Sequence, residues 1–229
     1  MIPKVVWQCF KTKKLSPVLQ HHIDRQKKMN PTWTFHLYDD DDIRTFIKTY
    51  YDEDMLNTFN MLTSGAGKAD LWRYLVLYQF GGLYLDFDSE IVTPLDEWIK
   101  EDDHCILSQE GCTQPPELCP YPGVNRCMVQ WALLYAPKHP FMKATIDQVV
   151  YNIKNKINPS NLLICSGPVV YTNRIYTTIM QSAKDNTKIN FRKTKGFDYD
   201  GHLRFQNDQV KEAMYSKNEY WRHQQNHIH

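Results

Sequence analysis

The segment from Ala66 to Glu90, AGKADLWRYLVLYQFGGLYLDFDSE, constrains the fold of this chain more than any other. Apolar residues recur at helical spacing up to about residue 80, which predicts a helix with a wide apolar face. Gly81-Gly82 predicts the end of that helix, because glycine adopts positive φ at little steric cost. The apolar residues after the glycines predict a short strand that runs into Asp86-Phe87-Asp88. We therefore expect a helix, a tight turn and a buried strand that leads into a pair of carboxylates.

The carboxylates of Asp86 and Asp88 are candidate metal ligands. On a strand, residues i and i+2 share a face and lie about 6–7 Å apart. Two carboxylates placed in this way can hold one divalent cation, directly or through water, and leave positions open for phosphate oxygens. Presenting two charges after a buried strand would be costly without a partner for the charge. Other Asp-x-Asp pairs, such as Asp39/Asp41 and Asp198/Asp200, lack this apolar lead-in and are interpreted as turns.

Two other phosphate-handling motifs do not fit the sequence. A haloacid dehalogenase-type phosphatase also begins with an apolar strand and D-x-D, but it requires Thr or Val where this chain has Glu90. The GAGK at 65–68 is not a phosphate-binding loop, because Leu62 and Ala69 stand where that loop has Gly and Ser or Thr.

KADLWRY at 68–74 and GGLYLDFD at 81–88 resemble the DXD region of glycosyltransferase family 32 and its relatives. These include yeast α-mannosyltransferases, α-1,4-glycosyltransferases and, with the same pattern, clostridial glucosylating toxins. The resemblance implies a GT-A-type α/β fold, with a mixed, mainly parallel sheet flanked by helices and the donor at the carboxyl ends of the strands. It implies Mn²⁺- or Mg²⁺-dependent transfer of a hexose, with retention, from a nucleotide-diphosphate sugar to a hydroxyl of a glycan or other glycoconjugate.

The same resemblance implies roles for five residues of the segment. Asp88 is expected to bind the metal directly, and Asp86 to bind it through water and to contact the ribose. In relatives the equivalent of Asp70 holds sugar hydroxyls and that of Arg73 lies near the diphosphate or the sugar. The alternative interpretation of Asp70 and Arg73 is an ion pair between residues one turn apart on a helix surface. Tyr84 is either a donor contact or a core residue, and no residue can be named as a covalent nucleophile.

Three further candidates for the nucleotide-sugar site lie outside this segment. IPKVVWQ at 2–8 predicts a strand and resembles the family's IPK-x-I-H-Q. Trp7 stands where His is usual, and Gln8 follows it. In the toxins a Trp at this place stacks on uracil, which favours a UDP-sugar here; the alternatives are a core aromatic and a GDP-mannose-dependent mannosyltransferase. Asn125 resembles a family residue that could face the sugar or the acceptor, or it is a helix cap.

The C-terminal residues 211–229 are polar, and we expect them to form a lid over the active site. Trp221 resembles a family Trp that closes over the diphosphate. Tyr215 stands about where the family has a His, which leaves the third metal ligand open, with His223 as a candidate.

Length and composition limit the remaining possibilities. The 229 residues predict a single domain spanning 1–229, and 27 basic against 26 acidic residues give no basic excess for nucleic acid. There is no apolar run of about 18 residues and no signal peptide, so we expect no transmembrane segment and a cytoplasmic enzyme, bacterial or in the host cytoplasm if viral. None of the six cysteines forms a C-x-x-C pair, which favours free thiols over a disulfide or metal.

Periodicity and breakers predict the other elements. Helices are expected at about 17–29, 43–50, 53–62, 141–153 and 169–181, strands at 33–38 and 105–107, and a loop at 110–124. Two functions of other classes stay open: a metal-independent glycoside hydrolase, which also uses two carboxylates, and a non-catalytic nucleotide-sugar-binding domain.

Overall fold

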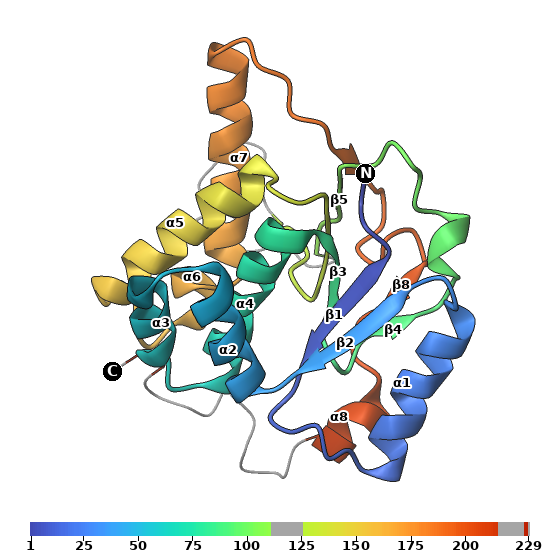
Figure 1. Ribbon diagram of the computed structural model, residues 1–229. Helices are drawn as coiled ribbons and strands as arrows, with labels where there is room; N and C mark the ends of the chain where they lie inside the picture. Colours follow the sequence, from blue (N-terminus) through green and yellow to red (C-terminus); the bar gives the residue numbers. More distant parts are fainter. Residues whose placement is uncertain (111–125, 215–226, 229) are drawn as a thin grey trace.

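A mixed six-stranded sheet forms the centre of the molecule (Figure 1), in a computed structural model that describes residues 1–110, 126–214 and 227–228. The strands, in spatial order, are β2 (Thr34–Tyr38), β1 (Val5–Cys9), β3 (Gly82–Leu85), β6 (Ala132–Tyr135), β5 (Cys105–Leu107) and β7 (Arg192–Lys193). β1 runs parallel to β2 and β3, and β5 runs parallel to β7, whereas β6 is antiparallel to both of its neighbours. The predicted mixed, mainly parallel α/β sheet is therefore confirmed.

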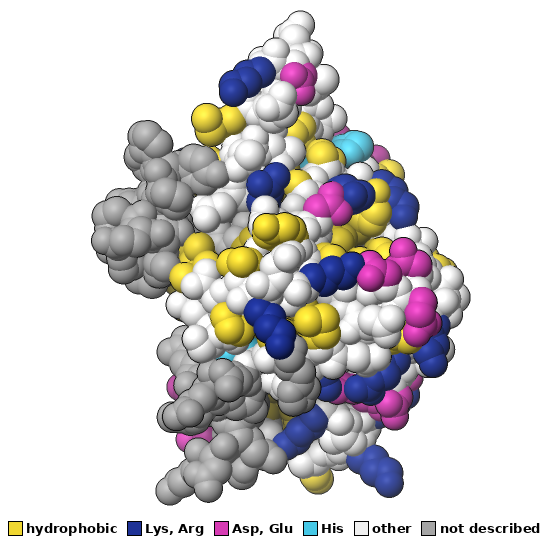
Figure 2. Space-filling view, turned by 90° about the vertical axis from the view of Figure 1, so that its left-hand side faces the viewer, with side chains coloured by type: hydrophobic (Ala, Val, Ile, Leu, Met, Phe, Trp, Pro, Cys, Tyr) yellow, Lys and Arg dark blue, Asp and Glu magenta, His cyan; other side chains and the backbone are white. Residues whose placement is uncertain are grey.

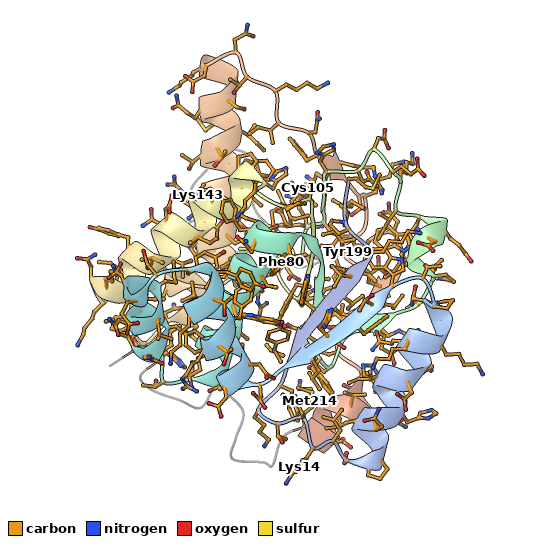
Figure 3. All side chains as sticks on the ribbon, viewed as in Figure 1. Lys14, Phe80, Cys105, Lys143, Tyr199 and Met214 are labelled. Carbon is orange, nitrogen blue, oxygen red and sulfur yellow. The ribbon has the colours of Figure 1, made fainter. Side chains whose placement is uncertain are left out.

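Helices and a small second sheet cover the two faces. One face carries α2 (Asp40–Tyr50), α3 (Glu53–Asn60), α4 (Gly65–Phe80), α5 (Pro140–Lys154), α6 (Leu162–Cys165) and α7 (Pro168–Lys184). The other side carries α1 (Pro17–Met29), the 3₁₀ turn η1 (Leu95–Glu97), α8 (Asp208–Met214) and the strand pair β4 (Glu90–Ile91) and β8 (Leu203–Arg204). Figure 3 shows the side chains that fill these layers, with Phe80, Cys105 and Tyr199 inside and Lys14 and Lys143 at the periphery.

The helix α4 is the central helix of the fold. It begins at the Ser64 cap, whose hydroxyl accepts the N–H of Gly67 at 3.1 Å. The sequence predicts one wide apolar face, but the structure buries the helix nearly all round, with Asp70 and every residue to Leu77 buried. An all-round buried helix is expected to be apolar on every side. The two buried charged residues of this helix, Asp70 and Arg73, therefore need partners inside the protein.

The glycine pair makes the turn from α4 into β3, as predicted. Gly81 and Gly82 have φ of 67° and 104°, which residues with a side chain rarely adopt. A Cβ at Gly82 would lie 2.5 Å from Cγ1 and 2.6 Å from the carbonyl oxygen of Val5. Only glycine therefore lets β3 lie directly against β1.

The strand β3 ends at Leu85, one residue before the paired carboxylates. Asp86, Phe87 and Asp88 form a turn, in which the N–H of Ser89 donates to the carbonyl of Asp86 at 2.9 Å. The prediction that Asp86 and Asp88 share one face of a strand is therefore wrong, because these residues do not continue β3. The turn still holds the two side chains two residues apart at the carboxyl end of β3.

Two further observations concern the charges on the surface and the state of the cysteines. Over the described part of the face in Figure 2, basic and acidic side chains are interspersed. Among the described cysteines, Cys9, Cys105 and Cys165 are free thiols, as expected.

Candidate active site

A cavity of about 720 Å³ lies where β1 and β3 end at their carboxyl termini. Its walls come from residues 9–11 at the end of β1, the first turns of α4, the turn after β3 and the start of α7, together with Phe205, Gln206 and Met214. Ligands in open α/β sheets bind at the carboxyl ends of strands, because loops and helix starts meet there. The predicted residues Asp70, Arg73, Tyr84, Asp86 and Asp88 all line this one cavity.

Arg73 is the centre of the polar network in the cavity wall. Its Nη2 lies 3.3 Å from Oδ1 of Asp70 and 3.3 Å from Oδ1 of Asp86. Its Nε and Nη1 donate to the carbonyls of Ala69 and Gln130, and its guanidinium lies 4.5 Å from the centroid of the Tyr84 ring. The neighbouring negative charges, Asp86 first, hold the pKa of Arg73 above its ordinary value despite its burial. The alternative of a surface ion pair is excluded, because Arg73 is only 5% exposed.

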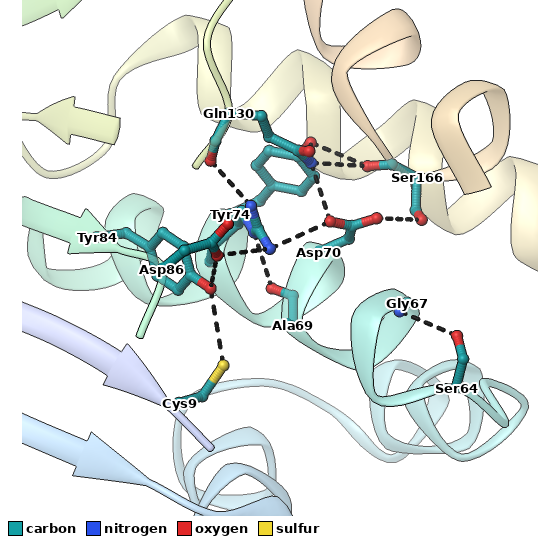
Figure 4. A network of polar contacts seen from close by, with 11 residues as sticks. Cys9, Ser64, Gly67, Ala69, Asp70, Tyr74, Tyr84, Asp86, Gln130 and Ser166 are labelled. Carbon is teal, nitrogen blue, oxygen red and sulfur yellow. Dashed lines mark hydrogen bonds and ion pairs between the residues drawn. The ribbon is translucent and has the colours of Figure 1, made fainter. Parts of the chain in front are cut away.

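Asp70 is held from three sides (Figure 4). Its Oδ2 accepts from the hydroxyl of Ser166 at 2.8 Å, and its Oδ1 accepts from the amide of Gln130 at 3.1 Å, besides the contact with Arg73. Burial raises the pKa of Asp70 to about 6, against the lowering effect of Arg73 and the hydrogen bonds. The carboxylate is thus fixed in direction, and Oδ2 keeps a lone pair for a hydroxyl in the cavity.

Asp86 and Asp88 differ in their surroundings. The hydroxyl of Tyr84 donates to Oδ1 of Asp86 at 2.8 Å, so Tyr84 is both a core residue and a support of the site. Burial, and then the negative charge of Asp86, raise the pKa of Asp88 to about 7. Two crowded carboxylates of this kind fit a divalent cation, because its charge would offset their repulsion and oxygen is the ligand that Mn²⁺ and Mg²⁺ prefer. Among the residues described, no group of three His, Cys, Asp or Glu could hold a metal, so a third ligand is not identified there.

The backbone of the Asp88 turn is held by the C-terminal part of the chain. The N–H of Asn207 donates to the carbonyl of Asp88 at 2.6 Å. Asn207 and Arg204 both bind the carboxylate of Glu90, which is 2% exposed and also pairs with Arg25 at 2.6 Å. Glu90 thereby fastens β8 and the start of α8 beside the carboxylate turn. The sequence gives no signal for these contacts, because each partner lies 65 or more positions from Glu90.

Trp7 and Gln8 lie away from the cavity lining. The Trp7 indole is 6% exposed, donates to the carbonyl of Gly81 at 2.8 Å and stacks on His36 at 4.8 Å. Trp7 is therefore a core aromatic residue, which is the alternative interpretation of the sequence. Its position gives no support to stacking on uracil. The aromatic ring that follows β1 in the cavity wall is that of Phe10, which stacks on Phe87 at 4.9 Å.

Three predicted site residues, Asn125, Trp221 and His223, lie outside the described residues. Of the predicted lid 211–229, the structure describes 211–214, at the end of α8, and 227–228. Met214 is buried in a cluster with Leu19, and Ile228 pairs with Leu62. Both described ends of this segment are therefore attached to the body, and the lid stays a prediction.

The structure adds three site residues that the sequence reasoning missed: Glu110, Gln130 and Ser166. Gln130 and Glu110 line the cavity, and Ser166 orients Asp70 from behind it. Ser166 lies two residues before Pro168, where α7 begins. Asp70 and Ser166 are 96 positions apart, so only the folded chain brings them together.

The known proteins that this chain resembles include glycosyltransferases. The family model "Glycosyltransferase sugar-binding region containing DXD motif" matches residues 16–104. The chain is 21% identical over 210 residues to the initiation-specific alpha-1,6-mannosyltransferase of Candida albicans, covering 79% of this chain and 54% of that protein. It is 34% identical over 172 residues to mannosyl phosphorylinositol ceramide synthase of Saccharomyces cerevisiae, covering 74% and 41%.

Among solved structures, "PaToxG Glycosyltransferase" shares the fold, with a TM-score of 0.59 at 17% identity over 80% of this chain and 72% of that one. These matches confirm the predicted resemblance to DXD glycosyltransferases and the GT-A-type fold. The chain spans about half the length of the curated relatives it matches.

The predicted location is wrong. A bacterial or viral cytoplasmic enzyme is contradicted by the curated matches, which are yeast mannosyltransferases. The prediction rests on the lack of a leader and an anchor, which carries no conclusion for a chain that spans about half of its relatives. Within residues 1–110, 126–214 and 227–228, no helix is long and apolar enough to cross a membrane.

Proposed function

We propose that this chain transfers a hexose from a nucleotide-diphosphate sugar to a hydroxyl of a glycan or glycoconjugate, in a reaction that requires Mn²⁺ or Mg²⁺. The observation that carries this proposal is the convergence of Asp70, Asp86 and Asp88 on one cavity around Arg73. The names of the matched relatives, which are mannosyltransferases and a glycosyltransferase, support the same class of reaction.

The carboxylates of Asp86 and Asp88 would hold the cation, and the bound cation would stabilise negative charge on the leaving diphosphate as a Lewis acid. Asp70 would accept a hydrogen bond from a hydroxyl of the transferred sugar, since Ser166 and Gln130 fix its carboxylate. Arg73 would act as a positioning residue. Its Nε, Nη1 and Nη2 are already engaged by two carbonyls and two carboxylates, which hold Asp70 and Asp86 in a fixed relation.

Mannose is the sugar that the comparisons favour. The UDP-sugar expectation depends on Trp7, which lies in the core, whereas several matched relatives are named mannosyltransferases. We therefore propose GDP-mannose as the donor, with retention of anomeric configuration, and keep a UDP-hexose as the alternative. A proton NMR spectrum of the first product would give the anomeric configuration directly.

The test of donor and metal together is a thermal-shift panel of GDP-mannose, GDP, UDP-glucose and UDP, with and without Mn²⁺. A ligand that binds only the native state raises the melting temperature by mass action. We expect GDP-mannose with Mn²⁺ to give the largest shift and EDTA to abolish it. No shift with any nucleotide would contradict the proposed function, and a shift that survives EDTA would favour a metal-independent hydrolase or binding domain.

A further inference from the structure

Glu110 presents a carboxylate to the same cavity from the side of β5. It follows the short strand segment Cys105–Leu107, and its backbone N–H donates to the carbonyl of Cys127 at 2.8 Å. The adjacent residue Gln109 forms an isolated antiparallel bridge with Met128. These contacts fix the backbone at Glu110 and at the residue before it, so its side chain is placed in the cavity wall.

The Glu110 carboxylate is half-buried, and within the described part of the chain no hydrogen bond or ion pair engages it. A half-buried carboxylate without a partner costs free energy unless a ligand supplies one. Such a group in a cavity wall therefore indicates a ligand that donates hydrogen bonds or carries positive charge.

A divalent cation shared with Asp86 and Asp88 would be one such ligand. The described residues contain no group of three acidic, His or Cys side chains close enough to share a metal. Glu110 therefore does not complete a site with Asp86 and Asp88. A hydroxyl group is a ligand of the required kind, because it donates a charge-assisted hydrogen bond to a carboxylate, and the proposed hexose carries several hydroxyls.

We propose that Glu110 binds a hydroxyl of a hexose in the cavity, and so determines which sugar the site accepts. The inference rests on the proposed function, which supplies the hexose. The hydroxyl can belong to the transferred sugar or to the acceptor, and the two are distinguished by experiment. Burial, with the negative charge of Asp86, raises the pKa of Glu110 to about 7, as expected for a carboxyl in a cavity that Asp70, Asp86 and Asp88 also line.

The test compares the wild type with Glu110→Gln and Glu110→Ala, using the exposed Glu101→Gln as the matched control. Dissociation constants for GDP, GDP-mannose, UDP and UDP-glucose are measured by calorimetry in Mn²⁺. Mannosyl transfer to methyl α-D-mannoside and donor hydrolysis are measured beside them, and melting temperatures report the fold. Losing a hydrogen bond to a charged group is expected to weaken hexose recognition about 10- to 100-fold.

Two results support the inference. Weaker binding of the nucleotide sugar with unchanged binding of the nucleoside diphosphate assigns Glu110 to the transferred hexose. Unchanged binding of both, with unchanged donor hydrolysis and a raised KM for methyl α-D-mannoside, assigns it to the acceptor.

Three other results overturn the inference. In the first, all constants of Glu110→Gln and Glu110→Ala equal those of the wild type. In the second, the nucleoside diphosphate and the nucleotide sugar lose affinity equally, which would place Glu110 with the cation or the fold. The third is a wild type that binds none of the four nucleotides in Mn²⁺, which refutes the proposed function itself. The wild-type arm thus separates failure of the function from failure of the Glu110 assignment.

Discussion

At the residue scale, Arg73 determines whether the carboxylates of the cavity can be buried together. It is the cation shared by Asp70 and Asp86, at 3.3 Å from each. Breaking a buried ion pair by removing one partner is strongly destabilising, because an uncompensated charge stays behind. The stability of the site therefore depends on this side chain even where the chemistry does not touch it.

We predict that Arg73→Met, which keeps much of the side-chain volume, lowers the free energy of unfolding by about 3–5 kcal/mol. Arg44→Met is the control, because Arg44 pairs with the exposed Asp41 on the surface, and its loss should cost under about 1 kcal/mol. Urea unfolding of both variants measures the difference. Equal losses would mean that the central ion pairs do not stabilise the fold.

At the scale of single elements, the turn between α4 and β3 is the most restricted part of the backbone. Gly82→Ala would place a Cβ 2.5 Å from Val5 at a φ of 104°, so we expect a loss of about 1–3 kcal/mol or more. Gly65→Ala is the control, since nothing lies within 4 Å of its Cβ position at the start of α4. Denaturation midpoints should fall for the first variant and stay or rise for the second.

The helix α5 begins at a buried histidine that is expected to make stability depend on pH. Nδ1 of His139 accepts the N–H of Phe141 at 3.3 Å, and Nε2 lies 3.3 Å from the carbonyl of Asn190. Burial lowers the pKa of His139 from 6.5 to about 4. The unfolded state therefore binds the proton more readily, and stability should be lost as pH falls from about 6.5 to 4, by up to about 1.4 kcal/mol per pH unit.

His139→Asn retains a cap acceptor that does not titrate, so the slope of stability between pH 4 and 6.5 should flatten in this variant. Urea unfolding across that range gives the slopes. His21→Asn, at an exposed position of α1, should leave the wild-type slope unchanged. If His139→Asn kept the wild-type dependence of stability on pH, groups other than His139 would control the loss of stability at acid pH.

The sequence predicts most elements of this fold because local signals are strong there. The apolar helix, the glycine pair and the following strand each have a mechanism within a few residues, and the structure confirms them. The end of β3 is missed because the turn at Asp86 is held by Asn207, 119 positions away from Asp88. Gln130, Ser166 and Glu110 are missed for the same reason, since a cavity wall assembled from separate segments leaves no spacing pattern in the sequence.

At the scale of the whole molecule, the C-terminal segment extends from α8, beside the carboxylate turn, to Ile228, beside Leu62. We predict that hydrogen exchange over 211–229 slows when nucleoside diphosphate and Mn²⁺ are added, because a lid that closes over the donor becomes protected. Trp221→Ala should then lower turnover more than it lowers the melting temperature. Equally slow exchange with and without ligand would show packed structure and contradict the lid.

Under the proposed function, the paired carboxylates at the end of β3 make this cavity a metal-dependent sugar transferase site. The most direct measurement is release of the nucleoside diphosphate from the donor that stabilises the protein most, in Mn²⁺. We compare the wild type, Asp88→Asn and the exposed Asp102→Asn. Asp88→Asn should keep its fold and lower turnover about 100-fold or more, whereas Asp102→Asn should match the wild type. Near-normal turnover of a folded Asp88→Asn variant would contradict the account.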